Sequence, residues 1–301
     1  MVISLLTQIQ VLKYRSLNRL ESYLVPRELG KRSETSPYLS CDSYCLKCDF
    51  QVPRGISETE FLTSLFKISS QKSIFIPGRF VGIASQYFER IRPSFETIIV
   101  GDDDNTQSVE SLERLAIYSK RVFSVNLISQ SDKIKSIPLG IESPSYRSGG
   151  RLRNFSKSPS IDIENRPLNF LIAWNNETNI SKRLLALKEF EKSKSTRIVR
   201  KRIPAQVVHK LMRKTLFVPC PAGNGLDTHR IWESLYLGAI PLVLREDAFC
   251  GVEQWPILVI DDWEDVTSLS RLELENLYMQ NAIPVDLITQ KSLEILREIS
   301  K

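Results

Sequence analysis

Residues 215–244, TLFVPCPAGNGLDTHRIWESLYLGAIPLVL, contain the signals of a strand, a loop, a helix and a second strand. The apolar run Leu216–Val218 has the length and composition of a buried strand. The Pro/Gly/Asn-rich residues 219–225 continue neither a strand nor a helix. A helix is predicted from His229 to Leu237, and a second buried strand follows at 240–244. This β–loop–α–β unit predicts an α/β protein with a parallel sheet covered by helices.

The loop and the first helical turns of this unit have the chemistry of an anion site. Gly223 and Gly225 allow a ligand to approach the backbone closely. The helix N-terminus presents unpaired N–H groups, and Arg230 adds a planar fork of donors, so both suit a phosphate. Glu233 lies on the same helix face and is a better acceptor for ribose hydroxyls than for phosphate. These residues favour a nucleotide-sugar site; the alternative is a surface Arg–Glu pair on an ordinary helix.

The stretch FVPCPAGNGLDTHRIWESLYLGAIPLV, residues 217–243, closely resembles the nucleotide-sugar motif of bacterial exostosin-like glycosyltransferases. The shared pattern is a Pro-x-Gly-x-Gly loop, an Arg-x-x-Glu helix and a Gly-x-Ile-Pro strand entry. Ala222 departs from the pattern, because the family commonly has an arginine there, and one expected phosphate contact is lost with it. The resemblance implies that the following residues bind the donor: Pro221, Gly223, Asn224, Gly225, Arg230 and Glu233.

Length and composition limit the classes of protein that the chain can represent. With 301 residues it has room for one large or two ordinary domains, and its net charge of +6 suits anionic ligands without requiring nucleic acid. Its five cysteines, an odd number, form no evident disulfide framework, so we expect reduced thiols and a cytoplasmic protein. The sequence has no apolar run of about 18 residues and no recognisable signal peptide, so no membrane span is expected.

Residues 1–24 have the pattern of an amphipathic helix, in which leucines alternate with Lys13, Arg15 and Arg19. Such a helix either packs on the adjacent domain or lies on an anionic membrane surface. The second interpretation predicts peripheral contact with the inner membrane surface, whereas the first predicts none.

Alternating short strands and helices predict two α/β units. Residues 1–150 are expected to form a small N-terminal domain on the acceptor side, and residues 167–301 a nucleotide-sugar-binding domain with closing helices. Residues 151–166 are rich in Ser, Arg and Asn and are predicted to be the linker. Combined with the resemblance, this implies a GT-B-like fold, in which two Rossmann-like domains face each other across a cleft.

A second stretch of the C-terminal unit extends the resemblance. NNETNISKR, which follows the predicted strand at 168–173, is similar to the Thr-Asn-x-x-x-Arg pattern of the same family. The resemblance therefore adds Thr178, Asn179 and Arg183 to the donor site. A loop at this place in an α/β sheet is expected to face the ligand crevice.

The resemblance also implies an inverting transfer, which needs a base to remove the proton of the acceptor. Asp42 lies in a segment that is similar to a Ser-Pro-Tyr-x-Ser-Gly-Asp pattern of the family. Asp102 and Asp104 follow a predicted strand of the N-terminal unit, and His229 lies beside the donor motif. These four residues are the candidate catalytic groups, and the sequence does not choose among them.

Three acidic residues after one strand, Asp102 to Asp104, have a second interpretation. In GT-A glycosyltransferases an Asp-x-Asp at a strand end holds a divalent metal, and carboxylate oxygens suit magnesium or manganese. The opposing interpretation is a solvated turn that precedes a helix. We favour the turn, because only one clear strand lies before the motif, and we therefore expect no metal and no cofactor beyond the donor substrate.

The spacing of Cys41, Cys45 and Cys48 matches that of the iron–sulfur ligands of radical S-adenosylmethionine enzymes. Lys47 stands where those enzymes usually have an aromatic residue, and no glycine-rich partner motif follows. The cysteines are therefore interpreted as incidental, with the radical enzyme kept as an alternative.

The sequence thus predicts a glycosyltransferase that moves a sugar from a nucleoside diphosphate sugar to a hydroxyl of a glycan or glycolipid. Its expected context is the synthesis of surface polysaccharides or glycoconjugates. The alternative from another class is a non-catalytic nucleotide-sugar-binding module of the same fold. Nucleic acid is not expected as a partner, because no aromatic residues interrupt the basic run at 192–202. The sequence gives no indication of the oligomeric state.

Overall fold

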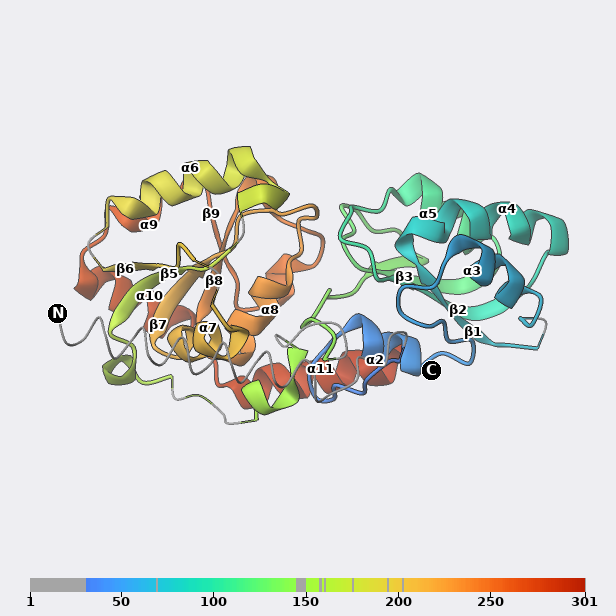
Figure 1. Cartoon of the computed structure of the whole chain (residues 1–301), viewed down its shortest axis with the longest axis horizontal. Coiled ribbons are helices and arrows are strands. Elements are labelled where there is room, and N and C mark those ends of the chain that lie inside the picture. The colour runs from blue at the N-terminus through green and yellow to red at the C-terminus, as the bar shows by residue number, and fades with distance from the viewer. Residues whose placement is uncertain are drawn as a thin grey trace.

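The computed structural model describes residues 31–300, apart from residues 69, 145–149, 157, 158, 160, 175, 194 and 202. Two parallel sheets, each with its own helices, lie side by side (Figure 1). This confirms the predicted α/β class and the presence of two parallel-sheet units. The amphipathic helix predicted at 1–24 lies outside the described residues.

The N-terminal sheet has four parallel strands in the order β1-β2-β3-β4. Because the chain moves across this sheet in one direction, right-handed crossovers place α4 and α5 on the same face. Figure 1 shows these two helices on one face and α2, beside α11, on the other. The elements are β1 (Ser73–Pro77), β2 (Phe95–Gly101), β3 (Ser119–Ser124), β4 (Ile134–Ser136), α2 (Cys41–Leu46), α3 (Glu58–Leu65), α4 (Val81–Ile91) and α5 (Val109–Ala116).

The C-terminal sheet has five parallel strands in the order β6-β5-β7-β8-β9. The chain runs from β5 outward to β6 and then back to β7, so the direction of winding reverses between β5 and β7. Ligands of open α/β sheets bind at such a switch point, beyond the carboxyl ends of the strands. The strands are β5 (Leu168–Ile172), β6 (Thr196–Ile198), β7 (Thr215–Pro219), β8 (Ile240–Leu244) and β9 (Leu258–Ile260). The helices are α6 (Ile180–Glu191), α7 (Ala205–Met212), α8 (His229–Tyr236), α9 (Glu264–Thr267), α10 (Arg271–Asn281) and α11 (Val285–Ile299).

The strand–loop–helix–strand unit predicted from residues 215–244 is confirmed as β7, α8 and β8. Every residue of β7 is buried, as expected for a central strand covered on both faces. The helix α8 ends where Gly238 adopts φ +74°, a left-handed conformation that glycine accepts without a steric penalty.

Two segments connect the units more closely than a flexible linker would. Phe155, in the predicted linker, is buried, and its carbonyl oxygen accepts a hydrogen bond from Tyr38 Oη at 2.9 Å. The last helix, α11, contacts both α8 and α2, and Arg121 Nη1 of β3 donates to Glu298 O at 3.4 Å. The end of the predicted C-terminal domain therefore packs against the N-terminal unit as well.

A membrane-spanning helix requires both length and apolar composition, and none of the helices in the described part of the chain combines the two.

Candidate functional site

The loops that follow β5 and β7 meet at the switch point of the C-terminal sheet. Asn179, which precedes α6, donates from Nδ2 to Gly223 O at 3.2 Å. Arg183 of α6 donates from Nε to Ala222 O at 3.4 Å. Arg230 of α8 donates from Nη2 to Ala173 O, after β5, at 2.9 Å. Contacts between residues 39 to 57 positions apart therefore bring predicted donor residues to one place.

Gly223 allows Arg183 to lie close to the loop. A Cβ atom at position 223 would come within 2.8 Å of Arg183 Nη2 and 3.8 Å of Thr178 Oγ1. The predicted residues Thr178, Asn179 and Arg183 thus surround the motif loop, as the sequence interpretation requires. Asn224, at the tip of this loop, is exposed, whereas Pro221 is buried and anchors it.

Arg230 and Glu233 form an ion pair on the first turns of α8. Arg230 Nη1 donates to Glu233 Oε2 at 2.7 Å, and only 8% of the Glu233 side chain is exposed. The other carboxylate oxygen, Oε1, lies 3.4 Å from His209 Nε2 of α7. Burial works against ionisation of Glu233, but Arg230 and then His209 outweigh it and lower the pKa to about 2. Glu233 is therefore an ionised group that faces protein rather than solvent.

Arg183 and Arg230 contribute two guanidinium groups, and Glu233 contributes one carboxylate. A second carboxylate, that of Asp247, accepts from Ala222 N of the loop at 3.4 Å and is paired with Lys182. Burial, together with the nearby charge of Arg230, lowers the pKa of Arg183, although its neighbour Cys220 acts in the opposite direction. Two arginines that are held near each other and partly desolvated form a site that an anion would stabilise. We call Arg183, Arg230, Glu233, His209 and the loop 221–225 the donor-side cluster.

The motif loop also joins the two units. A Cβ atom at Gly225 would collide with Asp104 O and would approach Asn126 Oδ1 to 2.6 Å. Asn126 Oδ1 accepts a hydrogen bond from Asp227 N at 2.9 Å. Glycine is thus needed at position 225 because the loop packs directly on the N-terminal unit.

Asp227 is buried at this junction, although its place before α8 is typical of a capping residue. Its Oδ2 accepts from Leu139 N at 2.7 Å, and its Oδ1 accepts from Trp232 Nε1 at 2.6 Å. Burial raises the pKa of Asp227 from 3.8 to about 7, although these hydrogen bonds oppose the shift. Thr228, the N-cap residue, makes no capping hydrogen bond with its side chain.

His229 reaches from α8 into the N-terminal unit. Its Nδ1 lies 2.7 Å from Gly140 O, and its Nε2 lies 3.6 Å from Glu142 Oε2. Since a carbonyl oxygen only accepts, Nδ1 is the donor of the hydrogen bond to Gly140 O. A quarter of the side chain, 26%, is exposed.

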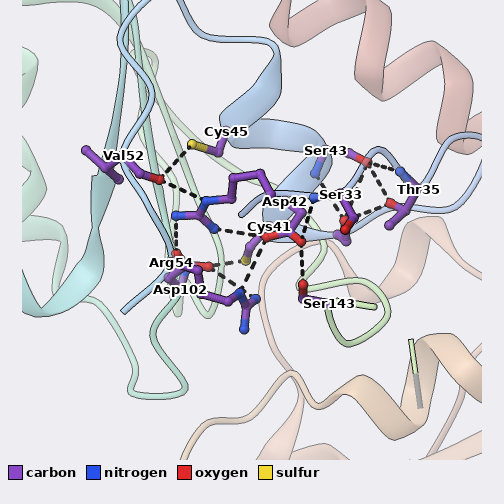
Figure 2. Close-up of polar contacts among 12 residues, drawn as sticks. Ser33, Thr35, Cys41, Asp42, Ser43, Cys45, Val52, Arg54, Asp102 and Ser143 are labelled. Atoms are coloured by element: carbon purple, nitrogen blue, oxygen red, sulfur yellow. Dashed lines mark hydrogen bonds and ion pairs between the residues drawn. The ribbon is translucent and has the colours of Figure 1, made fainter. Parts of the chain in front are cut away.

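Asp42 and Asp102 belong to a network of ion pairs in the N-terminal unit (Figure 2). Asp42 Oδ1 accepts from Arg32 Nη1 at 3.1 Å and from Arg54 Nε at 3.4 Å. Asp102 pairs with the same two arginines, at 2.5 Å from Arg32 Nη2 and at 3.4 Å from Arg54 Nη2. Arg54 also pairs with Glu142 at 3.3 Å. We call these two arginines and three carboxylates the junction cluster.

The junction cluster changes the interpretation of Asp42 as a base. Asp42 is fully buried, and Ser143 Oγ and Ser33 N donate to its second oxygen. Burial alone would lower the pKa of Arg32, but Asp102 and Asp42 raise it well above its ordinary value. A carboxylate saturated in this way is not available to remove a proton from a substrate. Asp102, at φ +56°, is nearly buried in the same network and is a similarly poor base.

Asp104 is exposed and is not a member of the junction cluster. Between the two, Asp103 accepts from Asn105 N at 2.9 Å, as in an Asx turn. The structure thus gives the three aspartates different roles, and within the described residues no three His, Cys, Asp or Glu side chains are arranged to hold a metal ion.

Cys41 and Cys45 of α2 and Cys48, two residues after its end, are buried in the core, and each thiol has a different partner. Cys41 Sγ accepts from Asp102 N at 3.3 Å, while Cys45 Sγ and Cys48 Sγ lie 3.6 Å from the carbonyl oxygens of Val52 and Tyr44. Burial raises the pKa of all three thiols, that of Cys45 to about 11. These thiols are protonated core groups, and the geometry gives no reason to propose a cluster there.

Sequence reasoning missed several residues of the site. His209, Asp227, Arg32, Arg54 and Glu142 carry no motif of their own, and their partners lie on other elements. For Asp227 alone there was a local signal, since it lies between the glycine loop and the helix.

Comparison with known proteins identifies no relative: no family model matches the sequence, and no curated protein matches it significantly. The function is therefore inferred from the residues themselves.

Proposed function

We propose that the protein is a glycosyltransferase of GT-B type that uses a nucleoside diphosphate sugar. The observation that carries this proposal is the position of two arginines at the switch point of the C-terminal sheet: Arg183 contacts the glycine loop at Ala222 O, and Arg230 contacts Ala173 O, just after β5. A diphosphate is the anion that fits two guanidinium groups beside a helix N-terminus. The likeness of residues 217–243 to the exostosin-like motif supports the same donor.

In the proposed reaction the diphosphate leaves as the acceptor hydroxyl attacks the sugar carbon. Negative charge builds on the oxygens of the diphosphate, and Arg183 and Arg230 would stabilise it. His229 is our candidate base, because the hydrogen bond of Nδ1 to Gly140 O leaves Nε2 as the nitrogen that can accept a proton in the neutral ring, and a quarter of the side chain is exposed. Glu142, 3.6 Å away, would stabilise the imidazolium that results.

A second candidate function, a non-catalytic binding module, has its own supporting observations. The carboxylates of Asp42 and Asp102 are saturated by ion pairs, and Ala222 removes the arginine that the resembled family has in the loop. Such a module would bind the donor without turning it over. The two functions therefore differ in turnover and not in the donor site.

A thermal-shift screen against nucleoside diphosphates and their sugars tests the proposal, since a ligand of the folded state raises the melting temperature. We expect at least one of them to stabilise the wild type and to have little effect on Arg230→Ala. Release of the sugar or the diphosphate with added acceptors, abolished in His229→Ala, would favour the enzyme. Binding without turnover would favour the module, and the absence of any shift would contradict both.

A further inference from the structure

Glu233 lies between two basic side chains. Its Oε2 accepts from Arg230 Nη1 at 2.7 Å, and its Oε1 lies 3.4 Å from His209 Nε2. A ribose ligand would need an acceptor oxygen that a substrate can reach, but only 8% of the Glu233 side chain is exposed and both of its oxygens face protein groups. The role that the sequence suggested for Glu233, holding the ribose, is therefore poorly supported by its position.

We propose instead that Glu233 and His209 are positioning residues, which hold Arg230 for the diphosphate. Glu233 then takes no part in binding the ribose hydroxyls. This inference rests on the proposed function, because it assumes that the ligand is a nucleoside diphosphate.

His209 supports a positioning role because its burial is otherwise costly. It is 1% exposed, and among the described residues neither ring nitrogen makes a hydrogen bond of good geometry. Its ring packs on Phe155, with centroids 5.1 Å apart, so α7 and the segment before β5 fix its position. Buried polar groups are normally satisfied, so an exception requires a reason. The proximity of His209 to Glu233 is such a reason, since a donor at Nε2 orients the carboxylate that pairs with Arg230.

The ion pair in turn fixes Arg230. The guanidinium is held at two points, Glu233 Oε2 and Ala173 O, which leave it 26% exposed. An arginine side chain loses considerable rotamer freedom when it binds a ligand, and a side chain that is already held loses less. Loss of Glu233 or His209 should therefore weaken phosphate binding without removing any phosphate contact.

The test measures binding of inorganic pyrophosphate, UDP and 2′,3′-dideoxy-UDP by calorimetry. We expect the ratio of the affinities for UDP and dideoxy-UDP to agree within about twofold between the wild type and Glu233→Gln, because Glu233 does not hold the hydroxyls. Glu233→Gln and His209→Phe should weaken the binding of pyrophosphate and of UDP to the same extent, by about five- to tenfold. His209→Gln, which restores an N–H donor, should recover most of the loss.

A readout that needs no ligand separates this inference from the proposed function. Modification of Arg230 by phenylglyoxal, measured by peptide mass spectrometry, should be faster in Glu233→Gln and His209→Phe than in the wild type. The matched control is Glu275→Gln, which breaks an Arg–Glu pair of 2.6 Å on α10 away from the site. It should leave both the rate at Arg230 and the affinities unchanged.

Two results would overturn the inference. The first is a wild type that binds dideoxy-UDP at least tenfold more weakly than UDP, with the difference erased by Glu233→Gln, because Glu233 would then hold the ribose. The second is an unchanged modification rate at Arg230 in both variants. Failure of the folded wild type to bind any of the three probes would instead contradict the proposed function, and the modification rates would still decide whether Glu233 and His209 hold Arg230.

Discussion

The junction cluster and the donor-side cluster are built from the same residue types but with opposite surplus charge. In the junction cluster, three carboxylates surround Arg32 and Arg54. In the donor-side cluster, Glu233 pairs with Arg230, and Arg183 lies close enough to Arg230 for the two charges to act on each other. The first arrangement neutralises its own cations and has no need of an anion, whereas we propose that the second gains from one. The comparison therefore predicts that substitutions in the first cluster change stability and that substitutions in the second change ligand affinity.

The largest expected effect is on the junction cluster. Asp42→Asn removes the fully buried carboxylate that pairs with Arg32 and Arg54. Breaking a buried ion pair from one side costs about 3–5 kcal/mol, so unfolding in urea should show a loss of this size. The control is Asp261→Asn, which breaks an exposed pair with Arg245 and should cost less than about 1 kcal/mol. Equal losses in the two variants would refute a structural role for the cluster.

The next effect concerns pH and Asp227, which is buried where the motif loop packs on the N-terminal unit. Its pKa is about 7 in the folded state and about 3.8 when unfolded, so the folded state binds the proton more tightly. Stability from this group is full below pH 4 and is lost as the pH rises toward 7, by about 4 kcal/mol at most. Asp227→Asn should lack this decrease. Parallel pH profiles of the free energy of unfolding for wild type and variant would contradict the burial of an acid here.

A smaller effect distinguishes the two glycines of the motif loop. Gly225→Ala places a Cβ atom against Asp104 O and Asn126 Oδ1 of the N-terminal unit and should cost about 1–3 kcal/mol of stability. Gly223→Ala meets only the flexible end of Arg183 and should cost less than 1 kcal/mol. Its effect should appear in diphosphate affinity instead. Thermal unfolding and calorimetry on both variants check this, and a reversed order would mean that the loop does not pack as described.

The smallest effect is on Arg183 alone. Arg183→Ala removes one guanidinium from the donor-side cluster and should weaken binding of a nucleoside diphosphate about tenfold, with Arg230 intact. Added salt should reduce the difference between wild type and variant, because charge is its source. Lys188→Ala, on the same helix, is the matched control and should have no effect. A tenfold loss in both variants would point to general electrostatic attraction and not to a site.

Secondary-structure elements could be predicted from the sequence where their signals lie in consecutive residues. We predicted β7 from the apolar run at 216–218, and α8 from the glycine loop and the helical spacing of the residues after it. Both predictions use only residues that are neighbours in the sequence. Helix α2 was not predicted, since its buried face carries Asp42 and cysteines in place of a leucine pattern. Phe155 was assigned to a linker by composition, although tertiary packing buries it.

The candidate site was predictable in part for the same reason. Arg230 and Glu233 lie one turn apart, so spacing indicated that they share a helix face. Asp42 was one of four candidate bases, named because its segment resembles a family pattern, and the sequence does not show its partners: Ser143 lies 101 residues away, and Arg54 approaches from a different segment. The contact of Glu233 with His209 was also not predictable from the sequence, because it exists only where α7 packs on α8.

The central claim is that Arg183 and Arg230 together bind a diphosphate. The most direct test is to titrate UDP into the wild type and into the Arg183→Ala/Arg230→Ala double variant. We expect one saturable site in the wild type, unaffected by EDTA, and an affinity at least about a hundredfold lower in the folded double variant. Binding of equal strength in both proteins would contradict the account. Binding that EDTA abolishes and manganese restores would contradict it equally, since an ion would then do what the two arginines are proposed to do.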